Sequence, residues 1–166
     1  LISGVHDLLP NRVGGAALQK NLETLGDIQY TQEEIDFALE LQRNNGKPEI
    51  GIDGKIRPLR ETLNSPGGGS TDSGDVSYNV PVVSLAATTA PKGVPWHSWS
   101  VVASSGMSIG HKGMLHAAKA LGMTMVDIFK DSKLRENIKK EFDEKIGEYE
   151  YDPYLDPGPP PIDYVD

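Results

Sequence analysis

The pattern best suited to nucleophilic chemistry spans residues 106–110, Gly-Met-Ser-Ile-Gly, which matches the G-x-S-x-G nucleophile elbow. An elbow serine needs a catalytic histidine later in the chain, after an acid. Only His111 and His116 follow Ser108, and both fall in the helix predicted to begin at that serine. A base three residues from the nucleophile cannot form a catalytic triad. We therefore interpret the pattern as a helix start with Ser108 as its N-cap.

A second set of residues could bind a metal ion. Asp72 and Asp75 lie in a Gly/Ser-rich loop before a predicted buried strand, and His97 follows that strand between Trp96 and Trp99. Loops at the carboxyl ends of buried strands are where open α/β sheets place their sites. A histidine and carboxylates converging there would suit zinc or manganese. The alternative is structural, with the aspartates in turns or helix caps and the histidine packed against aromatic rings.

The two histidines of the later helix do not form a metal site by themselves. His111 and His116 are five residues apart, which places them about 140° apart around a helix. They therefore cannot ligate one metal ion from one face of that helix.

Composition excludes several classes of protein. The chain has 166 residues, a net charge of −8 and no cysteine, so disulfide scaffolds, Cys-zinc modules and thiol chemistry are excluded. The charge argues against nucleic-acid binding, and no apolar run is long enough to cross a membrane. Residues 141–166 carry nine acids and one base, so the net charge resides in this tail. Because the first residue is Leu1, we expect a processed or cut piece of a longer protein.

Local signals predict four long helices and at least one buried strand. We expect helices over residues 11–25, 31–43, 108–129 and 132–147, the third being the main buried helix. Asn11 and Ser132 are the expected N-caps of the first and last helices, Gly26 is the expected C-terminal stop of the first, and Thr31 with Glu34 forms the expected capping box of the second. The apolar run over residues 80–87 predicts a buried strand, residues 1–5 the end of another, and residues 96–103 a strand or an extended loop. The predicted fold class is therefore α/β.

Several loops together resemble one enzyme family. Residues 68–77 read Gly-Gly-Ser-Thr-Asp-Ser-Gly-Asp-Val-Ser, and His97-Ser98 and His111-Lys112-Gly113 follow. This series resembles the C-terminal part of the co-catalytic metal amidohydrolases and peptidases related to carboxypeptidase G and aminoacylase. The most similar branch acts on p-aminobenzoyl-glutamate. The resemblance covers most of residues 1–150.

The resemblance implies a fold and a domain organisation. Residues 1–10 would be the exit strand and hinge from a lid or dimerisation domain that this chain lacks. Residues 11–148 would form the second half of a zinc-peptidase-like catalytic domain, with helices packed on a mostly parallel sheet. Residues 149–166 would be an extended or disordered acidic, proline-rich tail.

The resemblance also implies a site and its cofactors. Two divalent metal ions, zinc or manganese, would act with a glutamate general base from the missing half, so no catalytic residue is expected in this chain. His97 matches one metal ligand, although most of the family does not place a residue like Trp99 after the His-Ser pair, which leaves His111 as the fallback. Thr71, Asp72 and Asp75 would orient the substrate or the ligands.

The implied protein is a cytoplasmic hydrolase acting on a small N-acyl amino acid, with p-aminobenzoyl-glutamate as the leading substrate. It would form a homo- or hetero-oligomer and bind neither nucleic acid nor membrane, and this chain alone would be inactive. The competing hypothesis is a non-catalytic α/β interaction domain whose acidic tail binds a partner.

Overall fold

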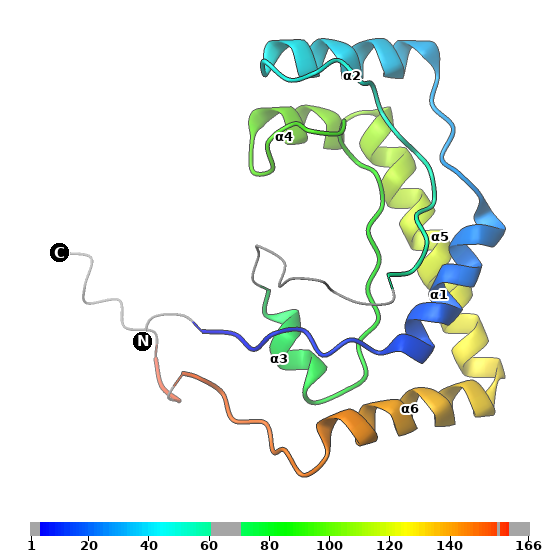
Figure 1. Cartoon of the computed structure of the whole chain (residues 1–166), viewed down its shortest axis with the longest axis vertical. Coiled ribbons are helices and arrows are strands. Elements are labelled where there is room, and N and C mark those ends of the chain that lie inside the picture. The colour runs from blue at the N-terminus through cyan, green and yellow to red at the C-terminus, as the bar shows by residue number, and fades with distance from the viewer. Residues whose placement is uncertain (1–3, 61–70, 156, 160–166) are drawn as a thin grey trace. The chain divides into compact units, whose positions relative to one another are not determined.

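The computed structural model describes residues 4–60, 71–155 and 157–159. The described residues form helices joined by extended segments, with no strand and one isolated parallel bridge between Pro10 and Val82 (Figure 1). The chain divides into two compact units. Unit 1 comprises residues 1–15, 60–83 and 131–166, and unit 2 comprises residues 16–59 and 84–130.

The predicted α/β class is wrong for the described residues, which are helical. The run over residues 80–87 is extended but finds no partner strand beyond the single bridge at Val82, and Val80 is 50% exposed. Pro81 also lacks the N–H that a ladder would use. Apolar, β-branched residues favour an extended backbone, but a sheet requires a second strand to satisfy its N–H and C=O groups.

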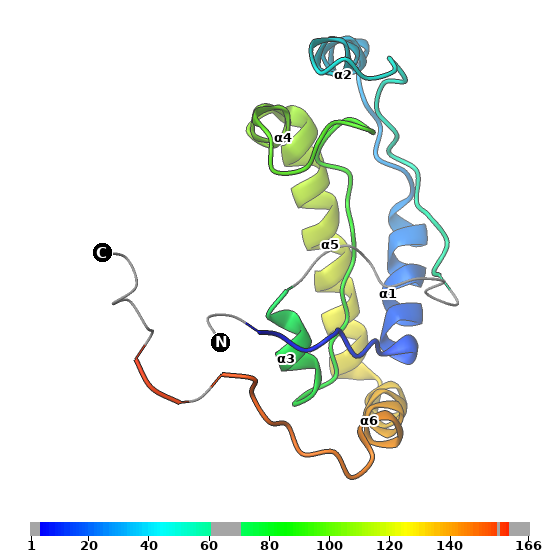
Figure 2. The ribbon, with the colours of Figure 1, turned by 60° about the vertical axis from the view of Figure 1, so that its left-hand side comes forward.

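The expectation for residues 96–103 is also wrong. Helix α4 (Trp99–Ser105) begins after Ser98 and leads through a short turn into α5 (Ser108–Lys130), as Figure 2 shows. The expected strand end over residues 1–5 falls partly on residues that the structure does not describe, and Gly4 and Val5 adopt no regular structure.

The predicted ends of the first two helices are confirmed. Asn11 Oδ1 accepts a hydrogen bond from Gly14 N–H at 2.8 Å before α1 (Arg12–Leu25), and Gly26 follows the helix with φ 74°. Helix α2 (Gln32–Asn44) carries the predicted capping box, in which Thr31 N–H donates to Glu34 Oε2 at 2.7 Å and Glu34 N–H donates to Thr31 Oγ1 at 3.3 Å.

Helix α5 is confirmed as a helix but is buried on one face only. Ile109 and Ala120 are almost fully buried, whereas Met114, Met125 and Phe129 are exposed. A helix that is apolar on more than one side is normally covered on more than one side.

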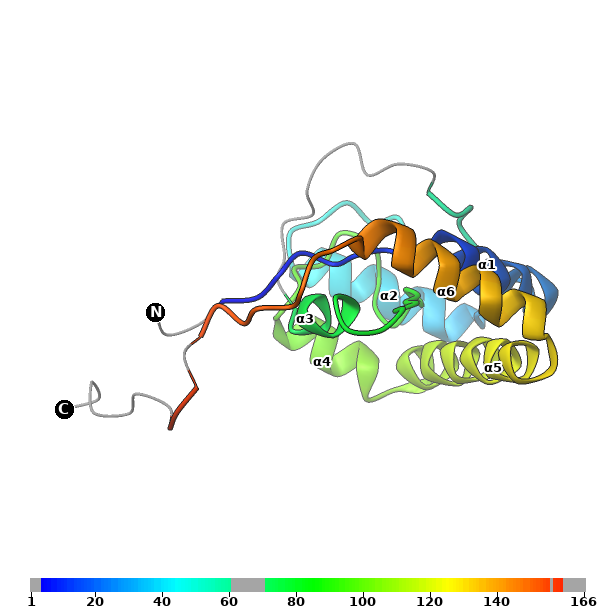
Figure 3. The ribbon, with the colours of Figure 1, turned by 90° about the horizontal axis from the view of Figure 1, so that it is seen from below.

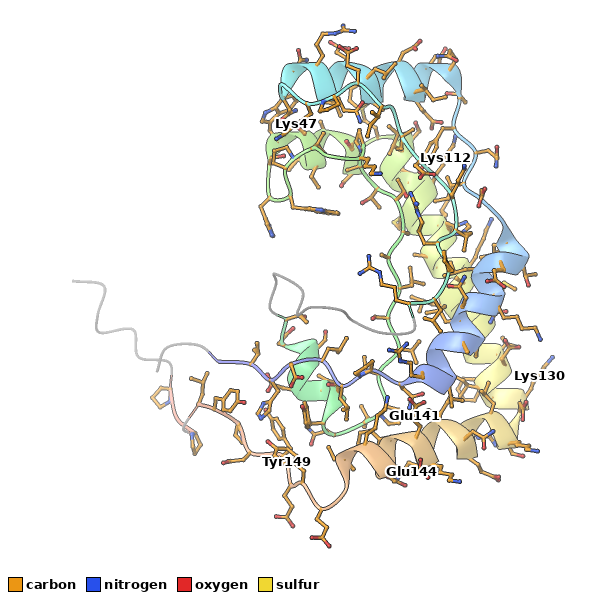
Figure 4. The ribbon with its side chains drawn as sticks, viewed as in Figure 1. Lys47, Lys112, Lys130, Glu141, Glu144 and Tyr149 are labelled. Carbon is orange, nitrogen blue, oxygen red and sulfur yellow. The ribbon has the colours of Figure 1, made fainter. Side chains whose placement is uncertain are left out.

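Helix α6 (Ser132–Ile146) is capped by Asp131 rather than by Ser132, because the Asp131 carboxylate accepts from Leu134 N–H at 3.0 Å. Glu141, labelled in Figure 4, accepts hydrogen bonds at 2.7 Å from the backbone N–H groups of Arg12 and Val13 in the first turn of α1. Burial works to raise the pKa of Glu141, but these bonds and one from Lys145 outweigh it and hold the pKa below its usual value. Glu141 therefore fastens α6 to the start of α1 within unit 1.

Candidate functional site

The Thr-Asp-Ser-Gly-Asp-Val-Ser loop of unit 1 folds into a turn and the short helix α3 (Ser73–Ser77). The segment before α1 runs alongside it (Figure 3). A Cβ added to Gly74 would overlap the carbonyl oxygen of His6 and lie 2.8 Å from its carbonyl carbon. A glycine is therefore required for α3 to approach this segment so closely.

Two other loop residues bind the same segment. Asp75 Oδ1 accepts hydrogen bonds from His6 N–H at 3.2 Å and from the His6 ring nitrogen Nδ1 at 2.7 Å. Ser77 Oγ accepts from Leu9 N–H at 2.8 Å and donates to Gly74 O at 2.6 Å. Three residues of the loop thus hold residues 6–9, which gives them a structural role.

His6, which the sequence did not single out, lies at the centre of a group of polar and aromatic side chains and is 7% exposed. Since Asp75 accepts from Nδ1, the other nitrogen, Nε2, accepts from the hydroxyl of Tyr149 at 2.9 Å. Tyr149 lies on the segment after α6 (Figure 4). The Tyr154 ring stacks on the imidazole, with centroids 4.1 Å apart and an interplanar angle of 8°. Both ring nitrogens and one face of His6 are therefore occupied.

The charge of Asp75 is stabilised by the same contacts. The hydrogen bond from the His6 ring lowers the pKa of Asp75 below its usual value, and the His6 backbone N–H adds to this effect. Nearby, Tyr78 donates to Asp7 at 2.8 Å, which raises the pKa of Tyr78 to about 12. We name the group His6, Asp75, Tyr78, Tyr149, Tyr151 and Tyr154 the His6 cluster.

Thr71 and Asp72, the first two residues of the loop, lie at the surface. Thr71 Oγ1 accepts from Ser73 N–H at 3.3 Å, which closes a local turn. Asp72 is exposed at the N-cap position of α3, and its side chain makes no capping hydrogen bond. Of the three predicted residues of this loop, Asp75 is engaged by His6 while Thr71 and Asp72 stay at the surface.

In the His111-Lys112-Gly113 motif of unit 2, Lys112 and Gly113 have packing roles. Lys112 Nζ, labelled in Figure 4, lies 2.5 Å from the buried Glu34 carboxylate of the capping box and 2.9 Å from Gln29 O. Burial works to raise the pKa of Glu34, but hydrogen bonds from Lys112, Ser108 and Thr31 lower it to about 2. A Cβ on Gly113 would overlap Thr88 O.

His111 is exposed, one residue from this ion pair. The other histidine of α5, His116, has a buried Nε2 atom without a hydrogen-bond partner within the described parts of the chain. This difference in environment agrees with the expected angular separation of the two side chains on one helix.

His97, the predicted metal ligand, lies on the loop before α4 and is exposed. Its φ of 59° is the only positive value at a non-glycine residue of the described ranges. Non-glycine residues in the left-handed region are uncommon and are often found at functional sites. The tryptophans on either side, Trp96 and Trp99, are 71% and 57% exposed.

The residues described do not form a metal site on their own. No group of three or more histidine, cysteine, aspartate or glutamate side chains within these ranges could hold an ion. A zinc ion needs three or four protein ligands, and His97 alone would be one of them. No helix among the described residues is long and apolar enough to cross a membrane.

Comparisons with known proteins connect the sequence of this chain with a hydrolase subunit. No protein-family model matches the chain, and no solved structure matches it. The chain is 34% identical over 157 residues to a subunit of the p-aminobenzoyl-glutamate hydrolase of Escherichia coli K12, a match covering 80% of the chain and 33% of that protein. The chain therefore spans about a third of the length of this curated relative, and the identity supports a relationship to this hydrolase.

Proposed function

We propose that the chain is one part of a metal-dependent amidohydrolase that cleaves the amide bond of an N-acyl amino acid. p-Aminobenzoyl-glutamate is the leading substrate. The observation that carries the proposal is the 34% identity to a hydrolase subunit over 80% of the chain.

The contacts of the two sequence motifs separate the residues that pack from those that are free to contact a ligand. Gly74, Asp75 and Ser77 hold the segment before α1, and Lys112 and Gly113 hold residues around the start of α2 and Thr88. Asp72, His97 and His111 are among the motif residues that remain exposed and that such packing does not account for. Exposed motif residues without a packing role are the best candidates for substrate or metal contacts.

Each of these residues receives a role in the proposal. His97 donates one imidazole ligand to a divalent zinc or manganese ion, and His111 is the fallback for this role. Thr71 and Asp72 contact or orient the substrate, whereas Asp75 acts through His6 by holding the local backbone. The proposal assigns the remaining ligands and the general base to regions of the longer hydrolase outside this chain.

The proposed enzyme is also expected to be an assembly. The E. coli relative is named as a subunit of its hydrolase. We therefore expect the longer hydrolase to work as part of a homo- or hetero-oligomer, with a small molecule as its substrate.

A hydrolysis assay tests the function. The longer hydrolase, containing this chain together with the other regions of the relative, is incubated with p-aminobenzoyl-glutamate, and release of p-aminobenzoate is measured. Release that stops on adding a chelator and returns with zinc or manganese is the expected result. The 166-residue chain alone is expected to release none. Turnover by the isolated chain, or no turnover of any N-acyl amino acid by the longer protein, would contradict the proposal.

A further inference from the structure

Helix α5 presents an apolar face to solvent along much of its length. Met114, Leu115 and Met125 are 58%, 54% and 57% exposed. The exposed apolar residues of α5 recur at spacings of three and four, and we name the following six the outer face of α5: Met114, Leu115, Ala118, Leu121, Met125 and Val126. Residues three and four apart share one side of a helix, so these side chains form a continuous surface. A continuous apolar surface, unlike single exposed apolar residues, marks a place where another element packs.

The opposite side of α5 is already occupied by other helices of unit 2. Asn21 Nδ2 on α1 donates to Thr124 Oγ1 at 3.1 Å and to Asp127 Oδ2 at 2.8 Å. Lys112 Nζ lies 2.5 Å from the Glu34 carboxylate in the first turn of α2. Helices α1 and α2 lie on the same side of α5 (Figure 3). The outer face is therefore a second packing surface, turned away from the contacts that hold α5 within unit 2.

The composition of the outer face suits an apolar element that approaches closely. None of its six residues carries a charge. Ala118 is small, and a Cβ added to the exposed Gly122, one turn later, would meet nothing within 4 Å. Small residues between larger ones allow the backbone of a neighbouring element to come near, while the larger side chains pack on either side of it. The face therefore fits a helix or strand with an apolar side.

The length of the E. coli relative indicates where such an element comes from. The match covers 33% of that subunit, so the other 67% of its length lies outside the region that this chain matches. Unit 2 also has a small core, because the buried apolar side chains among its described residues are these six: Leu18, Ala38, Leu41, Val94, Ile109 and Ala120. A larger fold buries a greater fraction of its surface, and covering the outer face of α5 would extend this core.

We propose that the outer face of α5 is an internal docking surface, covered in the longer hydrolase by an apolar element of the same polypeptide from outside these 166 residues. This inference rests on the proposed function, since the longer hydrolase is part of that proposal. Removing this uncharged face from water is favourable without any specific polar partner. Docking at this face would attach unit 2 to the rest of the hydrolase.

The chain has no cysteine, which allows a direct test with single thiols. Leu121→Cys and Met125→Cys each place a thiol on the outer face, and Glu40→Cys places one at an exposed position of α2 as the control. Each variant is treated with a maleimide in the isolated 166-residue chain and in the longer hydrolase. Mass spectrometry of the labelled peptides separates these thiols from cysteines elsewhere in the longer protein.

We expect both outer-face thiols to react at least about tenfold more slowly in the longer hydrolase than in the isolated chain, because a buried thiol reacts only when the structure opens locally. The thiol of Glu40→Cys should react at similar rates in both. Equal rates for the outer-face thiols in the two proteins would overturn the inference. Slowing of Glu40→Cys to the same extent would indicate general shielding of unit 2 and would overturn it too.

A photo-crosslink identifies what covers the face. p-Benzoylphenylalanine is incorporated at Lys119, an exposed position one turn from Leu115 at the edge of the face, and the crosslinked peptides are mapped. We expect crosslinks to peptides of the same polypeptide that lie outside the 166 residues. Crosslinks to a second polypeptide, or thiol labelling of the isolated chain that slows as its concentration rises, would mean that a second copy covers the face. That result, or crosslinks confined to the 166 residues, would overturn the inference.

The outcomes separate this inference from the proposed function. Protected outer-face thiols in a longer protein that hydrolyses no N-acyl amino acid would contradict the proposed function and leave the docking surface in place. Hydrolysis by a longer protein whose outer-face thiols react as fast as in the isolated chain would support an amidohydrolase and refute docking at α5.

Discussion

The close approach of α3 to the segment before α1 predicts a large effect of Gly74→Ala. The new Cβ would overlap His6 O and lie 2.8 Å from the His6 carbonyl carbon. Non-bonded carbon atoms rest about 3.5–4.0 Å apart, so relieving the overlap needs a backbone displacement of about 1 Å. A shift of that size would break the 2.8 Å hydrogen bond between Leu9 N–H and Ser77 Oγ.

The magnitude follows from these two losses. Overpacking a tightly packed position costs about 1–3 kcal/mol, and a lost backbone hydrogen bond costs about 1 kcal/mol. The higher helix propensity of alanine returns up to about 1 kcal/mol. We therefore expect Gly74→Ala to lower the free energy of unfolding by about 2 kcal/mol.

Gly122→Ala is the matched control. Gly122 is also helical, but a Cβ there meets nothing within 4 Å. This variant should be stabilised by about 0.5–1 kcal/mol. Urea unfolding followed by circular dichroism measures both changes, and amide hydrogen exchange at His6 and Leu9 reports the local contact. If Gly74→Ala were as stable as the parent chain, with unchanged protection at these amides, the packing described for α3 would be refuted.

Three further predictions concern individual polar contacts. Lys112→Ala leaves the buried Glu34 carboxylate without its ion pair and should lower the free energy of unfolding by about 1–3 kcal/mol in urea titrations, whereas the exposed Lys119→Ala should change it by less than about 0.5 kcal/mol. Because the pKa of Glu34 is lowered from 4.5 to about 2 in the folded chain, its contribution to stability should be complete above pH 4.5 and be lost as the pH falls from there toward 2. An acid titration of Glu34→Gln that keeps the full slope of the parent in this window would count against this contact. Tyr149→Phe removes the hydrogen bond to His6 Nε2, so the ¹⁵N shift of that nitrogen should change, and an unchanged shift would show that the bond does not form in solution.

Helix boundaries could be predicted because their signals are local. The side chain of Asn11, the pair Thr31 and Glu34, and Gly26 each act within one turn of the helix end that they define. The same reasoning missed the cap of α6 by one residue, since Asp131 and Ser132 are both good N-cap residues.

The sequence could not show whether a sheet would form, because strand pairing depends on a partner strand elsewhere in the chain. The apolar run over residues 80–87 specifies an extended backbone, but within the described ranges only Pro10 forms a bridge with it. Within the described ranges the run is therefore an extended segment with a single bridge, and it forms no sheet.

The sequence did not predict the contacts of the candidate site. Asp75 was expected to orient the substrate or the ligands, and that role stays a prediction. Its hydrogen-bond partner in the structure, His6, lies 69 residues earlier, and no spacing rule connects the two. Tyrosines at positions 149 and 151, followed by Tyr154, were the available signal that the tail packs on an aromatic or imidazole group. The role of His97 came from the family resemblance and stays a prediction.

The central claim is that His97 ligates a metal ion in a longer hydrolase, and counting metal ions tests it most directly. The longer protein and its His97→Ala variant are purified with zinc and analysed by elemental mass spectrometry, with His116→Ala as a control. We predict that His97→Ala loses about one metal equivalent and most hydrolysis of p-aminobenzoyl-glutamate while its circular dichroism spectrum is unchanged. Full metal content and unchanged turnover in His97→Ala would contradict the claim.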